Sequence, residues 1–203
     1  MSDVVSYELV DNIAVISIDN PPVNAMGHAV RQGTWDAIDK FTSDEEAKAA
    51  VLICAGRTFI AGADIREFNR PPENPWLPEL VQKIEDCSKI VVAAIHGTAL
   101  GGGLETAVGC HYRCAVESAK LGFPEVLLGL LPGATGTQRL PRLAGVEKAL
   151  DMLVSGKPVS AAAAKDIGLI DEIIEGDLLE GAIAYTQGLL NSNAPLRQLS
   201  KVE

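Results

Sequence analysis

The 203 residues of this chain lack the segments that would carry it into or across a membrane. The N-terminus, MSDVVSYELVDN, has no basic region followed by the apolar stretch of a secretory signal. No apolar run approaches the ~18 residues of a membrane-spanning helix. We therefore expect a cytoplasmic protein with no membrane partner, the peroxisome being the alternative in a eukaryote.

Positive charge is also scarce. The chain has 17 Lys and Arg against 27 Asp and Glu, which gives a net charge of −10. This balance argues against nucleic acid or an anionic membrane as the main partner, although a local basic spot for a phosphorylated ligand remains compatible with it. Hydrophobic residues make up 47% of the chain, enough for one substantial core, so we expect residues 1–203 to form a single domain.

Motifs of nucleotide, metal and serine-hydrolase chemistry are missing. There is no GxGxxG fingerprint, GxSxG nucleophile elbow, HExxH pair or Asp-rich calcium loop. The three histidines are scattered, and the four cysteines form no CxxC pair, so buried free thiols are expected rather than disulfides or metal ligands. Carboxylates and backbone amides are therefore the groups that remain available for catalysis or binding.

Strand and helix patterns alternate from end to end, which predicts an α/β fold. The apolar segments AAVLICAG (49–56) and IVVAAIHG (90–97) are typical of buried strands, and each runs into a glycine-bearing loop and a helix. Other expected elements are an opening hairpin around residues 11–12 and helices at 27–41, 78–89, 104–110, 140–156 (with a joint at Gly145), 160–168 and 177–192.

The two glycine loops are candidates for binding a negatively charged oxygen. In ALGGGLE, the triplet Gly101–Gly103 stands directly before a helix whose first-turn amides have no intrahelical partner. The loop FIAGADI offers a second amide near Ala63. Two convergent amides would form an oxyanion hole. The alternative is that these glycines serve only as turns and that Glu105 only complements the helix dipole.

A second glutamate, Glu125, follows Pro124 and precedes an apolar run. Leu127, Leu128 and the two leucines at 130 and 131 predict a dry setting that would raise the pKa of this carboxyl group. Two glutamates in such settings can divide the acid and base roles. The alternative is an ordinary residue at a helix start or turn.

The segments FIAGADI, HGTALGGGLE, GFPEVLLGLLPGATGTQRLPRLAG and AAKDIGLIDEI resemble the crotonase (enoyl-CoA hydratase/isomerase) superfamily over about residues 5–190. They are most similar to the N-terminal hydratase/isomerase part of multifunctional fatty-acid β-oxidation enzymes. The resemblance implies a spiral of repeated ββα units. Because the chain stops at APLRQLSKVE, we expect the usual C-terminal helical region to be short or absent and the sequence to be a fragment.

The resemblance implies an acyl-CoA substrate whose thioester oxygen accepts hydrogen bonds from the N–H groups of Ala63 and Gly102. It assigns catalysis to Glu105 and Glu125. Coenzyme A is part of the substrate, and no other cofactor and no metal are expected. The residues assigned to substrate and CoA binding are Arg57, Ala61, Gly62, Ala63, Asp64, Ile65, Arg66, Gly101 and Gly133.

The implied activity is hydration of the 2,3 double bond of a 2-enoyl-CoA in fatty-acid β-oxidation, with Δ3,Δ2-enoyl-CoA isomerisation as a companion activity. The alternatives are isomerisation alone, thioester hydrolysis, or an inactive CoA-binding module. Thr135 stands where stand-alone hydratases usually have glycine, which leaves the acyl preference open. The family further implies a homo-trimer or hexamer when the C-terminal helices are present, or else part of a multifunctional chain.

Overall fold

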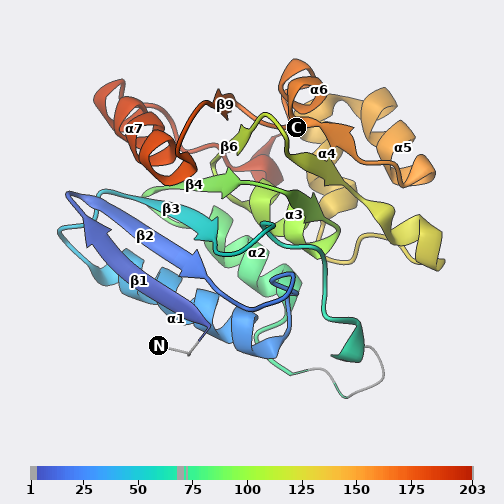
Figure 1. The fold of residues 1–203 in the computed structure, drawn as a ribbon, viewed down its shortest axis with the longest axis horizontal. Helices are drawn as coiled ribbons and strands as arrows, with labels where there is room; N and C mark the ends of the chain where they lie inside the picture. The colour runs from blue at the N-terminus through green and yellow to red at the C-terminus, as the bar shows by residue number, and fades with distance from the viewer. Residues whose placement is uncertain (1–3, 68–70, 72, 203) are drawn as a thin grey trace.

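A six-stranded sheet forms the centre of the computed structural model, which describes residues 4–67, 71 and 73–202 (Figure 1). The strand order is β1-β2-β3-β4-β6-β9. The hairpin β1–β2 is antiparallel, as expected, and the remaining pairs are parallel. The strands are β1 (Val5–Val10), β2 (Ile13–Ile18), β3 (Ala49–Cys54), β4 (Ile90–Ile95), β6 (Tyr112–Val116) and β9 (Glu172–Ile174).

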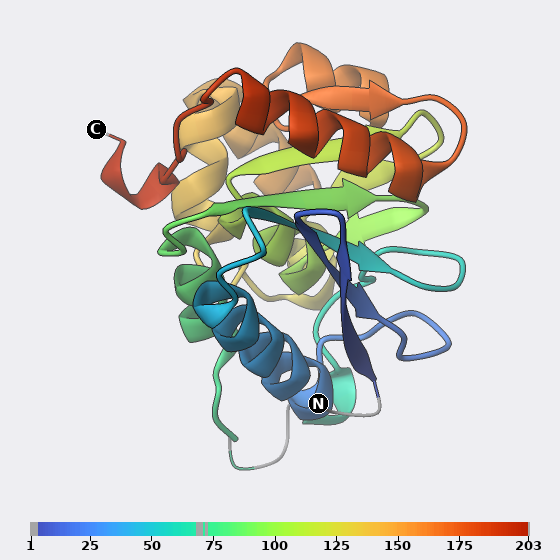
Figure 2. The ribbon, with the colours of Figure 1, turned by 90° about the vertical axis from the view of Figure 1, so that its left-hand side faces the viewer.

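Both faces of the sheet are covered, which explains why its central strands are apolar throughout rather than alternating. On β3, Ala50 and Leu52 belong to one buried cluster, whereas Ala49 and Val51 belong to another. The first cluster includes side chains of α1 (His28–Ser43), α2 (Leu77–Glu85) and α3 (Gly102–Gly109), and the second lies under α7 (Leu178–Asn191). Figure 2 shows α1 and α7 on opposite sides of the sheet.

A smaller sheet joins β5 (Thr98–Leu100), β7 (Lys120–Gly122) and β8 (Val159–Ser160) in that order. The sequence did not predict β5 and β8, because segments of two or three residues are too short to show a periodic pattern. This sheet supports the glycine triplet, since the Gly101 N–H donates to the Gly122 carbonyl at 3.0 Å.

The helical region predicted at 140–156 consists of α4 (Gly136–Ala144) and α5 (Val146–Ser155). They meet at Gly145, which has a φ of +78° and confirms the predicted joint. Helix α4 begins four residues earlier than predicted. Beyond it lie α6 (Ala161–Asp166), α7 and a short 3-10 turn, η3 (Leu199–Lys201).

The two strand–glycine–helix units lie side by side, and this places both glycine loops at one edge of the sheet. Strands β3 and β4 are parallel neighbours with Ala49 opposite Ile90, so their carboxyl ends point the same way. The loop after β3 leads to a 3-10 turn, η1 (Ile65–Glu67), and the loop after β4 leads to α3. The Leu100 N–H donates to the Ile60 carbonyl at 3.0 Å and joins the two loops.

All four cysteines are free and buried, as expected. In the described residues, no helix is long and apolar enough to cross a membrane.

Candidate active site

A cavity of about 660 Å³ opens where the two glycine loops meet the segment that follows β7. Most of the residues singled out from the sequence line it. They are Ala61, Gly62, Ala63, Asp64, Ile65, Gly101, Gly102, Glu105, Glu125 and Gly133. Arg57 and Arg66 are the predicted residues that do not contribute to this lining.

Each residue of the glycine triplet packs so closely against another group that a Cβ atom would force that group to shift. Gly101 has a φ of +49°, and a Cβ atom built on it would lie 2.7 Å from Glu125 Oε1. A Cβ on Gly102 would lie 2.8 Å from Leu77 Cδ2, and one on Gly103 would overlap the Ile60 carbonyl oxygen. The absence of side chains is therefore what lets the start of α3 pack against the neighbouring loop.

The N–H groups of Ala63 and Gly102 lie close together at the cavity. A Cβ on Gly102 would stand 3.5 Å from the Ala63 nitrogen. Within the described part of the chain, neither N–H donates a hydrogen bond to another residue. Gly102 is the first residue of α3, where the helix dipole places partial positive charge. The arrangement can bind an oxygen that carries negative charge.

Glu105 lies in the first turn of α3 and is only 2% exposed. Its Oε1 accepts hydrogen bonds from the N–H groups of Ala134 (2.6 Å) and Gly136 (2.8 Å). Burial raises the pKa of Glu105 to about 7, and the nearby Glu125 carboxyl also raises it, whereas the two N–H donors oppose this rise. A carboxyl group with this pKa can both accept and release a proton near neutral pH.

Glu125 lies in a 3-10 turn, η2 (Pro124–Leu128), and its carboxyl group packs against Gly101. Burial raises the pKa of Glu125. Its Oε2 is buried and has no hydrogen-bond partner among the described residues. A buried oxygen without a hydrogen-bond donor favours the neutral carboxyl group, in line with the raised pKa of Glu125.

The expected cause of this raised pKa was wrong. Leu127 and Leu131 are 71% and 76% exposed, and Leu128 and Leu130 are exposed as well. Leu128, Leu130 and Leu131 border the cavity, whereas Leu127 lies on the surface of this chain. The glycine loop beside Glu125 buries the carboxyl group instead, and sequence spacing alone cannot show such a contact.

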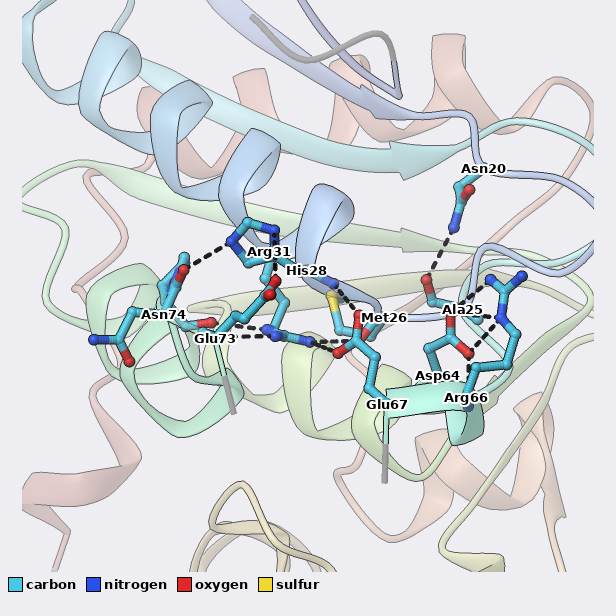
Figure 3. Close-up of polar contacts among 11 residues, drawn as sticks. Asn20, Ala25, Met26, His28, Arg31, Asp64, Arg66, Glu67, Glu73 and Asn74 are labelled. Atoms are coloured by element: carbon cyan, nitrogen blue, oxygen red, sulfur yellow. Dashed lines mark hydrogen bonds and ion pairs between the residues drawn. The ribbon is translucent and has the colours of Figure 1, made fainter. Parts of the chain in front are cut away.

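A buried arginine ties the loop of Ala63 to helix α1 (Figure 3). Arg31 donates to Glu67 Oε2 at 2.7 Å, and the His28 N–H donates to the other oxygen of Glu67 at 2.6 Å. Arg31 also donates to the carbonyls of Met26, Glu73 and Pro75. Since the Met26 N–H bonds to Gly62, the network holds the loop on both sides of Ala63.

Sequence reasoning missed Arg31 and Glu67. No local signal identifies them, because an arginine within an amphipathic helix and a glutamate in a loop are typical of exposed positions. Only the packing of η1 against α1 shows that Arg31 is 8% exposed.

The two arginines expected at the CoA site differ in their surroundings. Arg66 forms a two-point ion pair with Asp64, with Nη2 2.6 Å from Oδ2, and its side chain is largely exposed (Figure 3). Arg57 is exposed at the turn after β3. Among the described residues, no three His, Cys, Asp or Glu side chains gather as a metal site would require.

Known proteins resemble this chain in sequence over most of its length. A family model described as enoyl-CoA hydratase/isomerase matches residues 8–202. The chain is 45% identical over 195 residues to a peroxisomal bifunctional enzyme of Danio rerio, a match that covers 96% of this chain and 27% of that protein. It is 44% identical over 165 residues to a probable enoyl-CoA hydratase of Bacillus subtilis (strain 168), covering 78% of this chain and 64% of that protein. The chain therefore spans about a quarter of the length of the bifunctional relative.

Solved structures show the same fold. An enoyl-CoA hydratase from Bacillus anthracis superimposes with a TM-score of 0.86 at 31% identity, over 93% of this chain and 77% of that one. EchA1_1 from Mycobacterium paratuberculosis superimposes with a TM-score of 0.87 at 36% identity, over 98% of this chain and 80% of that one. These matches confirm the predicted α/β crotonase fold. The chain belongs to the enoyl-CoA hydratase/isomerase family, also called the crotonase family.

Proposed function

We propose that this chain hydrates the 2,3 double bond of a 2-enoyl-CoA thioester, as a step of fatty-acid β-oxidation. The observation that carries the proposal is the placement of two carboxyl groups with raised pKa values, Glu105 and Glu125, on one cavity beside two unpaired N–H groups. Relatives named as enoyl-CoA hydratases and as β-oxidation multifunctional proteins support the substrate class.

In the proposed reaction, the thioester oxygen accepts hydrogen bonds from the N–H groups of Ala63 and Gly102. Addition of water at C3 moves the double-bond electrons toward C2 and the carbonyl. An enolate forms, and its negative charge lies on the thioester oxygen. Each donor aimed at such an oxygen is worth about 3–4 kcal/mol at the transition state. The N-terminus of α3 adds the positive end of its dipole at the same point.

The two glutamates divide the proton transfers. Two N–H donors on Glu105 oppose the effect of burial and keep its ionised form accessible near pH 7, so we assign Glu105 as the group that accepts a proton from the attacking water. The buried, unpartnered oxygen of Glu125 favours the neutral form, so Glu125 gives its proton to C2. One turnover leaves the proton on Glu105 instead of Glu125, and proton exchange through water in the cavity restores the starting state.

The loop 61–65 is proposed to hold the CoA part of the substrate, since its residues line the cavity next to Ala63. Arg57 and Arg66 are proposed to meet the phosphates of CoA from the outside of this loop. Arginine suits phosphate because it can offer two parallel hydrogen bonds. Arg66 would share its guanidinium between Asp64 and the phosphate.

The test is hydration of crotonyl-CoA by the purified chain and by the variants Glu105→Gln and Glu125→Gln. Each substitution keeps the shape of the side chain but removes proton transfer, and loss of one such group lowers kcat by about 10²- to 10⁴-fold. Glu117→Gln, at an exposed turn, is the control and should match the unmodified chain. Wild-type rates in either active-site variant would exclude that glutamate from the mechanism.

Isomerisation is a second candidate, because one carboxyl group beside the same two amides can move a proton from C2 to C4 through the same enolate. Parallel assays with 3-enoyl-CoA, and of CoA release from saturated acyl-CoA, separate hydratase, isomerase and thioester hydrolase activities. CoA binding in calorimetry without turnover of any ester would instead identify a binding module.

A further inference from the structure

We propose that Arg139 is a positioning residue for Glu105, acting through Thr135 and anchored by Glu85. The inference deepens the proposed function, because it rests on Glu105 being the group that accepts a proton. None of these three residues lines the cavity, so each would act on the reaction only through its neighbours.

The anchor is an ion pair removed from water. Glu85 ends α2 and Arg139 lies in α4, and their side chains are 1% and 3% exposed. Arg139 Nη2 lies 3.0 Å from Glu85 Oε2, and the same nitrogen donates to Gln82 Oε1 at 3.0 Å. Removing two charges from water costs several kcal/mol per ion, so such a pair is weak evidence for stability by itself. We therefore infer that this ion pair serves to hold neighbouring groups in position.

Two further residues, Ser200 and Gln198, also bind Glu85. The Ser200 N–H donates to Glu85 Oε1 at 3.1 Å, and the side chain of Gln198 donates to the Glu85 carbonyl at 3.1 Å. Burial raises the pKa of Glu85, but the hydrogen bonds from Ser200 and Arg139 outweigh it and leave this pKa below its ordinary value. Glu85 is therefore an ionised anchor that fixes the guanidinium of Arg139.

The Nη1 atom of Arg139 reaches the loop that holds Glu105. It donates to the hydroxyl of Thr135, which in turn donates to the Ala134 carbonyl. Thr135 has a φ of +77°, a left-handed conformation that is unfavourable for a β-branched residue. A hydrogen bond from a fixed arginine is a direct means of keeping the residue in that conformation.

Thr135 stands between the two residues whose N–H groups bind Glu105. Ala134 precedes it and Gly136 follows it, and both donate to the same oxygen, Glu105 Oε1. The directions of these two N–H groups depend on the backbone angles of Thr135. The chain of contacts therefore runs from Glu85 through Arg139 and Thr135 to the two donors on Glu105.

The positive charge of Arg139 favours the ionised form of Glu105, as do the two N–H donors. Among the charged groups that affect Glu105, the Glu125 carboxyl raises its pKa, and the Arg139 guanidinium lowers it. Loss of Arg139 would remove one positive charge and loosen two N–H donors. Both effects disfavour ionised Glu105, so its titration should move to higher pH.

The experiment measures Glu105 directly and does not depend on turnover. The amide proton shifts of Ala134 and Gly136, followed by NMR against pH, report ionisation of the carboxyl group they bind. The unmodified chain should titrate with a midpoint near 7. In Arg139→Gln the midpoint should rise by about one pH unit, which corresponds to a tenfold weaker preference for the ionised form.

Two variants keep the test decisive. Thr135→Val removes the hydroxyl group but leaves the Glu85–Arg139 ion pair intact, so it addresses the contact even if Arg139→Gln unfolds the chain. Its midpoint should also rise. Arg142→Gln is the matched control: this arginine is exposed on the same helix and bonds to the carbonyls of Val202 and Gln138. Its midpoint should stay at that of the unmodified chain.

Crotonyl-CoA kinetics complete the test. If Glu105 is the base, Arg139→Gln and Thr135→Val should lower kcat by about tenfold or more, leave KM within about twofold, and move the pH profile upward. Unshifted midpoints in folded Thr135→Val and Arg139→Gln would overturn the positioning role. Shifted midpoints in a chain that hydrates no enoyl-CoA would keep that role and exclude the proposed function.

Discussion

Gly101 packs directly against the carboxyl group of Glu125, so that a Cβ atom on Gly101 would lie 2.7 Å from Glu125 Oε1. The same glycine has a φ of +49° and precedes the first residue of α3, Gly102. One residue thus shapes both the approach of the helix N-terminus to the cavity and the place of the second carboxyl group. This double constraint makes Gly101 a sensitive point of the site.

We expect Gly101→Ala to displace the Glu125 carboxyl group and to lower kcat for crotonyl-CoA by more than about tenfold. Gly145→Ala provides the matched control, because Gly145 also has a positive φ (+78°), but a Cβ atom on it would meet no described atom within 4 Å. Neither glycine has backbone angles that alanine favours (φ/ψ of +49°/−123° at Gly101 and +78°/+158° at Gly145), so each variant should also lose about 1–3 kcal/mol of stability. Equal activity in the two would show that the contact with Glu125 has no consequence.

The pH dependence of hydration should be bell-shaped. Glu105 and Glu125 influence one another, so the pair titrates in two steps that belong to both groups. The active form carries one proton, and kcat/KM should therefore fall when the pair gains a second proton and when it loses its last. Since the pKa of Glu105 lies near 7, the maximum should be near neutral pH. A flat profile from pH 5 to 9, measured at saturating and at low substrate, would contradict this assignment.

Ionisation of Glu105, which the proposed reaction requires, should lower the free energy of unfolding. Its pKa is about 7 in the folded chain against an ordinary value of 4.5, so the folded state binds more protons between these two values. The stability that the protonated carboxyl group contributes is complete below pH 4.5 and is lost as pH rises through 7.

Gln cannot ionise, so Glu105→Gln should be more stable than the unmodified chain by about 3 kcal/mol at pH 8, with no difference near pH 4. Urea unfolding at the two pH values measures this gap, and Glu117→Gln should show none. A gap that is the same at both pH values would mean that the effect comes from packing rather than ionisation.

The ion pair between Arg31 and Glu67 should support the loop of Ala63. Glu67→Gln removes the negative charge beside a buried arginine while keeping the side-chain shape. We expect a loss of about 1–3 kcal/mol of unfolding free energy, less than for a fully buried pair because Glu67 is 32% exposed on its side chain. Loosening of the loop should also lower kcat more than it raises KM.

Glu172→Gln is the control for this variant, since it breaks the exposed Lys165–Glu172 ion pair on the far part of the fold. Exposed pairs contribute about 0–1 kcal/mol, so stability and kcat should both change little. If Glu67→Gln behaves like Glu172→Gln, the loop of Ala63 does not depend on its tie to α1.

Much of the fold could be predicted because its signals are local. Strands β3 and β4 are continuous apolar runs because both of their faces are buried, and such runs bounded by glycine are recognisable without a structure. Gly145 separated two helices as expected, since no Cβ is tolerated well at its positive φ. The triplet Gly101–Gly103, which ends two residues before Glu105, likewise predicted a helix start with a carboxyl group in its first turn.

The setting of the second glutamate needed the tertiary structure. The apolar run after Glu125 predicted burial by leucines, but those side chains are exposed and the glycine loop buries the carboxyl group instead. An apolar run says that a segment can be buried, and it does not say which surface covers it. The same limit applies to β5 and β8, which are defined by their partners rather than by their own residues.

The alternating α/β architecture, the two glycine loops and the residue types available for chemistry can be read from the sequence, because each depends on what a few adjacent residues allow the backbone to do. Three relationships depend on packing: Ala63 lies beside Gly102, Ala134 and Gly136 bind Glu105, and Arg31 and Arg139 are buried in ion pairs. These relationships join segments that are far apart along the chain. Their energies come from burial and hydrogen-bond direction, which exist only once the segments have packed.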